Sequence, residues 1–182
     1  MNARLPAENS DTVSLVCALL VRYPEIASIR SMPGEGTVRF TYAVGMRLDR
    51  RKQRSIVDEI EAHVGGLLSL VGERGDVSVD CESDGSLSFI HVTRDLDTFT
   101  KDELAMLTSF LADRFGAALV RNPAAEENAD EDPAFQDELA ESAIEALRDP
   151  AQSKSLVGFR EEKRVLVYFL KSQKKAKASA RR

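Results

Sequence analysis

The feature that most constrains the fold of this chain is a unit of two strands, a tight turn and a helix, which the sequence contains twice. In the first copy, segments 26–32 and 37–44 are rich in β-branched and aromatic residues and flank a turn that contains two glycines. Residues 50–64 carry apolar side chains at three- and four-residue spacing. This spacing predicts a helix, and Gly65 and Gly66 are placed to end it.

The second copy follows with predicted strands at 77–81 and 86–93 and a predicted helix that runs from Thr100 to Gly116. Aligning the two copies matches residues 38–40 with residues 87–89, which favours an internal duplication. Two tandem ββα units predict one antiparallel sheet with both helices on one face. We therefore expect Ile60 of the first helix and Leu107 of the second to share one core.

The start of the second helix carries a capping box. Thr100 stands three residues before Glu103, and Phe99 and Leu104 flank this pair at the spacing of a hydrophobic staple. The pattern predicts that the Thr100 hydroxyl caps the amide of Glu103 and that the Glu103 carboxylate reaches back to Thr100.

Three further elements complete the predicted fold. An almost entirely apolar helix is expected at 12–22, with Ser10 or Asp11 as its cap, and an acidic helix is expected to begin at Asp132-Pro133 with Phe135 on its apolar face. Segments 156–160 and 164–170 are expected to form a third hairpin. Its second strand is apolar on both faces, which favours cover on both sides and self-association through this C-terminal hairpin.

These elements predict an α+β fold: an antiparallel sheet of about six strands built from tandem ββα units plus a C-terminal hairpin, with helices mainly on one face. We expect residues 1–121 to contain the first helix and the duplicated core. Residues 122–132 are expected to form an acidic mobile loop, and 133–170 to complete the same domain with the acidic helix and the hairpin. Residues 171–182 are expected to be a disordered basic tail.

Composition narrows the functional classes. The formal net charge is −5 over 182 residues, whereas the residues after Leu170 carry six basic side chains and no acidic one. The first residues lack the pattern of an export signal, and no apolar stretch reaches the length of a membrane span. Two cysteines, Cys17 and Cys81, are too few for a disulfide framework. We expect a cytoplasmic protein that does not contact membranes.

Catalytic and metal-binding motifs are absent from the sequence. It contains no nucleophile elbow, phosphate loop, paired metal-binding histidines or dinucleotide fingerprint. His63 and His91 each stand apart from other candidate ligands, so structural roles are favoured over general-base roles. We assign no catalytic residue, no metal site and no cofactor.

A cluster of cations around the start of the first unit's helix is the most informative polar feature. Its members are Arg47, Arg50, Arg51, Lys52 and Arg54. Cations at a helix start oppose the helix dipole, but together with the free amides they attract anions such as phosphate. A solvated face, or pairing with the protein's own acidic segment, is the competing interpretation. The predicted tail adds Lys174, Lys175 and Lys177 as further candidate contacts to nucleic acid.

Three functional hypotheses follow from these patterns. The leading one is a non-catalytic binding or regulatory protein that contacts an anionic partner, namely RNA, DNA or a ribonucleoprotein, through the cation cluster and the tail. The alternative is a protein-interaction adaptor that uses its acidic helix to bind a basic partner. The third is a small enzyme whose site is assembled from scattered residues that no linear motif reveals.

Overall fold

The computed structural model describes residues 7–121, 132–161 and 164–170. Helices, strands and 3₁₀ turns follow one another along the chain in this order: α1 (Ala7–Arg22), β1 (Ile26–Met32), η1 (Pro33–Glu35), β2 (Thr37–Val44), α2 (Arg50–Val71), β3 (Val77–Asp84), β4 (Leu87–Asp95), α3 (Lys101–Phe115), η2 (Gly116–Ala118), α4 (Pro133–Arg148), β5 (Leu156–Glu161) and β6 (Arg164–Phe169).

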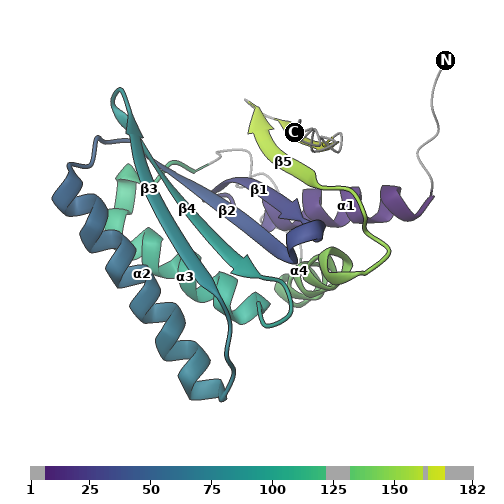
Figure 1. Ribbon diagram of the computed structural model, residues 1–182. Coiled ribbons are helices and arrows are strands. Elements are labelled where there is room, and N and C mark those ends of the chain that lie inside the picture. The colour runs from purple at the N-terminus through teal and green to yellow at the C-terminus, as the bar shows by residue number, and fades with distance from the viewer. Residues whose placement is uncertain (1–6, 122–131, 162–163, 171–182) are drawn as a thin grey trace, which may run out of the picture.

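The six strands form one antiparallel sheet in the order β3-β4-β2-β1-β5-β6 (Figure 1). Three hairpins account for it: β1 with β2, β3 with β4, and β5 with β6. β4 pairs with β2, and β5 returns from the C-terminal part of the chain to pair with β1. The predicted α+β class and the antiparallel sheet are confirmed.

The helices cover one face of this sheet, and the core lies between them and the strands. One row of residues that are register partners from strand to strand lies on this face. From β3 to β6 the row consists of Val79, Val92, Phe40, Ile29, Gly158 and Val167. Val79, Val92, Phe40 and Ile29 are buried. Ile60 of α2 and Leu107 of α3 are fully buried in the same cluster, as the sequence predicts.

The opposite face of the sheet, which we call the open face, carries none of the described helices. The adjacent row of opposed residues points there and consists of Asp80, His91, Thr41, Ser28, Phe159 and Leu166, none of which is fully buried. Phe89 belongs to this face, whereas Phe40 points into the core. The alignment of 38–40 with 87–89 therefore matches opposite faces, and the duplication is not confirmed.

Helix α2 is longer than predicted, since it continues through Gly65 and Gly66 to Val71. Val64 and Leu68 extend its buried stripe past the glycines, and burial of that stripe outweighs the low helix propensity of Gly. The helix ends at Gly72, whose φ of 72° allows its amide to bond the carbonyls of Leu68 and Ser69.

Two other helix predictions need correction. α1 begins at Ala7, so Ser10 and Asp11 lie inside the helix rather than at its cap. α4 begins where predicted, because the Asp132 carboxylate accepts from the amide of Ala134 at 3.0 Å. Phe135 is nevertheless 52% exposed, since the buried face of α4 is formed farther along the helix by Ala140, Ala143, Ile144 and Leu147.

The start of α3 follows the predicted cap only in part. The hydroxyl of Thr100 accepts from the amide of Glu103 at 3.2 Å, and Phe99 and Leu104 are fully buried beside it. The Glu103 carboxylate does not reach back to Thr100. It accepts instead from the buried guanidinium of Arg94 on β4, at 2.5 Å and 3.1 Å, so this side chain fastens α3 to the sheet.

Candidate anion-binding site

The cation cluster lies on the loop before α2 and on its first turns. Asp49 fixes the start of the helix, because its carboxylate accepts from the amide of Lys52 at 2.8 Å and its backbone has the extended geometry of an N-cap. Arg47 lies two residues before Asp49 and the other cations follow it, and all five side chains are exposed: Arg47, Arg50, Arg51, Lys52 and Arg54. The cations therefore surround the start of α2, and their role as a binding site stays a prediction.

Arg47 differs from the other cations because it has an internal partner. Its guanidinium donates to the carbonyl of Gly85, at 3.3 Å, in the turn between β3 and β4. This contact ties the loop before α2 to the end of the neighbouring hairpin. The remaining four cations form no ion pair with any carboxylate in the described part of the chain.

The acidic helix does not neutralise this cluster. α4 packs against α1 and, less extensively, α3. Its Asp137 pairs with Arg22 of α1 at 3.3 Å, far along the sequence from α2. Within residues 132–148, the structure therefore gives no support to the competing interpretation in which the cluster pairs with the protein's own acidic segment.

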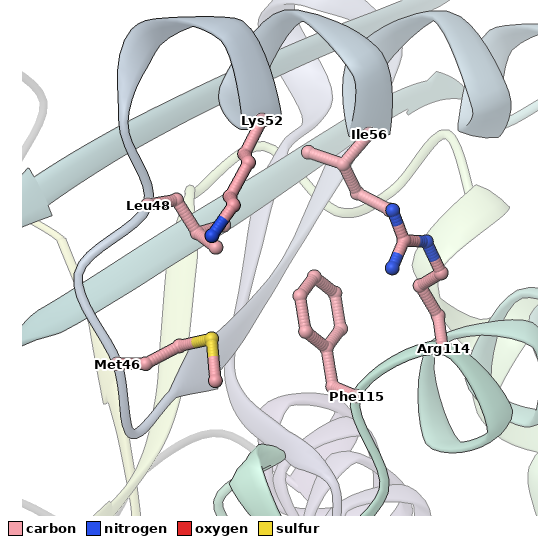
Figure 2. Close-up of a pocket in the computed structure, with 6 residues that line it drawn as sticks. All are labelled: Met46, Leu48, Lys52, Ile56, Arg114 and Phe115. Carbon is pink, nitrogen blue, oxygen red and sulfur yellow. The ribbon is translucent and has the colours of Figure 1, made fainter.

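A pocket of about 200 Å³ opens beside the cluster, and Lys52 is one of its walls. Figure 2 shows the Lys52 amine and the Arg114 guanidinium on opposite sides of this pocket, with the ring of Phe115 between them. Met46, Leu48 and Ile56 complete the lining. The pocket thus combines an apolar surface with two cationic groups.

Arg114 is held in place by Glu59 of α2. Its guanidinium donates to both Glu59 carboxylate oxygens, at 3.0 Å and 3.4 Å, and this hydrogen bonding from Arg114 lowers the pKa of Glu59. Arg114 could not be assigned to the candidate site from the sequence, because it lies near the end of α3, distant along the chain from the cluster. Only the packing of α3 beside α2 brings the two cations to one pocket.

The histidines have local partners. Nδ1 of His63 lies 2.7 Å from the Glu59 carbonyl, and its ring packs against the Phe110 ring at a tilt of 35°, with centroids 4.2 Å apart. His91 lies on the open face, where its two ring nitrogens contact Thr41 at 2.9 Å and Glu82 at 3.3 Å.

Nucleophilic and metal chemistry find little support in the described residues. Burial raises the pKa of the Cys17 and Cys81 thiols, which keeps them protonated and poorly nucleophilic. No group of three His, Cys, Asp or Glu side chains among these residues is arranged to hold a metal ion. None of the helices in the same part of the chain combines the length and apolar character that crossing a membrane requires.

The predicted tail contacts Lys174, Lys175 and Lys177 lie outside the described residues. The described part of the candidate site is the start of α2 with the adjoining pocket. Comparisons with protein-family models, with curated proteins and with solved structures found no match to this chain.

Proposed function

We propose that this protein is a non-catalytic binding protein that holds an anionic partner, RNA or DNA, at the start of α2. The observation that carries the proposal is the set of cations without carboxylate partners in the described part of the chain: Arg50, Arg51, Lys52 and Arg54. Unpaired cations on a protein that is acidic overall concentrate positive potential at one place. Phosphate groups are the anions that nucleic acids offer to such a place.

The pocket beside the cluster supports nucleic acid over a simple inorganic anion. Its apolar wall includes the Phe115 ring, against which a planar base can stack, and Lys52 lies at the same opening. Stacking tolerates every base, whereas phosphate contacts give affinity without sequence information. The expected partner is therefore a flexible, single-stranded segment that is bound with little sequence preference.

The test is a binding titration with fluorescently labelled single-stranded RNA and DNA, followed by anisotropy at several salt concentrations. The triple variant Arg50→Gln, Arg51→Gln and Lys52→Gln should bind more weakly. The slope of the logarithm of its binding constant against the logarithm of salt concentration should become shallower by roughly 0.7 per lost phosphate contact. Its folding stability should be unchanged or slightly higher, because the removed cations oppose the helix dipole.

A matched control removes the same charge elsewhere. Arg74→Gln, Lys101→Gln and Lys154→Gln change three cations outside the cluster, and this variant should keep its affinity and salt slope. Equal losses in both triple variants would mean that net charge, rather than a site, controls binding. Absence of binding by the wild-type protein at low salt would refute the proposal.

A second candidate function, a protein-interaction adaptor, rests on the exposed side of α4. Phe135 is 52% exposed there, and Glu138, Glu141 and Glu145 are exposed on the same helix. A basic peptide is the partner that this acidic helix fits. This function would be favoured if the protein binds a lysine-rich peptide, if the double variant Glu138→Gln/Glu141→Gln loses that binding, and if the protein does not bind nucleic acid.

A further inference from the structure

β6 forms one edge of the sheet, and no described strand lies beyond it. Its residues are Arg164, Val165, Leu166, Val167, Tyr168 and Phe169. Five of these six side chains are apolar or aromatic, and none is proline. An apolar edge without proline or acidic residues is a template for pairing with another strand.

The hydrogen-bonding pattern shows which backbone groups this edge leaves free. The amide of Leu170 donates to the carbonyl of Ser155 at 2.7 Å, and these two residues face each other one step beyond the pairing of β5 with β6. Hydrogen-bonded pairs alternate along an antiparallel ladder, so Leu166 and Tyr168 direct their amides and carbonyls to β5. Val165, Val167 and Phe169 consequently direct theirs away from the sheet.

The opposite edge of the same sheet is built differently. β3 carries Asp80, Glu82 and Asp84, and α2 packs beside it. Carboxylates along an edge discourage a further strand, since a second copy brings like charges together. β6 has no comparable protection in the described residues, so the chain protects one edge and leaves the other available.

The side chains next to the free edge are also incompletely covered. Tyr168 is 53% exposed, and its ring lies 6.0 Å from the ring of Phe159 on the open face. Leu166, on the same face, is half-buried. α1 packs against β6 on the helix face, where Val16 and Leu20 of α1 and Val167 of β6 surround Gly158. A strand added at this edge would bury apolar surface in addition to satisfying the free backbone groups.

We propose that β6 pairs antiparallel with β6 of a second copy of this chain, so that Leu166 faces the partner's Leu166 across a two-fold axis. A two-fold axis perpendicular to the sheet keeps each face continuous, so a residue of the open face must oppose another residue of that face. This register pairs the free backbone groups of Val165 with those of the partner's Val167. It also places Arg164, the single charge of β6, opposite the partner's Tyr168 ring, a favourable cation–π arrangement.

The test introduces a charge at the two-fold axis by replacing Leu166, and the oligomeric state is measured by sedimentation equilibrium. Leu166→Lys and Leu166→Glu should each be monomeric, because identical charges meet across the axis. An equimolar mixture of the two variants should form a heterodimer, since Lys then faces Glu. The wild-type protein should be a dimer, and each single variant should raise the dissociation constant at least tenfold.

A matched control and an independent measurement keep the outcome interpretable. Val157→Lys places the same charge on the open face one strand inside the edge, and the dimer should persist. Leu166→Cys should form a disulfide-linked dimer on mild oxidation, which also tests the register if the charged variants unfold. A monomeric wild-type protein, dimers that survive Leu166→Lys, or cross-linking through Val167→Cys in place of Leu166→Cys would overturn the proposal.

Discussion

Replacing Gly65 and Gly66 by alanine tests where α2 ends. The sequence predicts that these glycines terminate the helix, whereas the structure places both inside it, with φ values outside the positive range. Alanine is disfavoured at a positive-φ helix end but favoured in a helix interior. The sign of the stability change therefore distinguishes a helix that ends at residue 64 from one that ends at residue 71.

The expected magnitude follows from the surroundings of the two positions. Both residues are exposed, and a Cβ added to either one meets no atom within 4 Å. No packing change offsets the intrinsic effect, so each replacement should raise the free energy of unfolding by about 0.5–1 kcal/mol. The double variant should gain roughly 1–2 kcal/mol, part of it through the lower entropy of the unfolded chain.

The assay is urea denaturation followed by far-UV circular dichroism, with the wild-type protein measured in parallel. Gly72→Ala is the matched control, because its Cβ also meets no atom within 4 Å but its φ is 72°. This variant should lose stability, by about 1 kcal/mol. A loss of stability in Gly65→Ala or Gly66→Ala would refute the continuous helix.

Two further predictions concern the start of α3. Glu103→Leu should lower the free energy of unfolding by roughly 3 kcal/mol, because it leaves the fully buried Arg94 guanidinium with only part of its carboxylate contact. Adding Arg94→Met to this variant should recover most of the lost stability. Equal denaturation curves for Glu103→Leu and wild type would contradict the buried ion pair. Thr100→Ala should cost about 1 kcal/mol in the same assay while Thr100→Ser costs much less, and equal stability of both with wild type would place the helix start elsewhere.

Local patterns predicted most of the elements of this fold. Runs of β-branched, aromatic and other apolar residues predicted the positions of all six strands, and capping residues predicted the starts of α2, α3 and α4. What the sequence did not predict depends on contacts between distant segments. The alignment of 38–40 with 87–89 was wrong about the faces, because Phe89 is apolar yet lies on the open face, whereas Ser88 and Arg94 take core positions by bonding to the buried Leu48 and Glu103.

Of the candidate site, the cation cluster could be recognised in the sequence, whereas the pocket beside it could not. Five cations close together in sequence remain close on a helix start, so the cluster was visible without the structure. The pocket was not visible, because Arg114 and Phe115 come from α3 and meet Lys52 only through the packing of two helices. The Glu103 carboxylate was assigned to the cap of its own helix because the sequence gives no sign of Arg94 above it.

The position of β1 between β2 and β5 has a consequence for the order of folding. Ser28 faces Phe159 although most of the chain lies between them, so this pairing has a high contact order and a slow closure. Before β5 has been synthesised, β1 is an edge strand of the sheet. Val16 and Leu20 of α1 then also lack Gly158 to pack against. We therefore expect the pairing of β1 with β5 to form late in folding, and until it forms β1 is an edge strand that can pair with another chain.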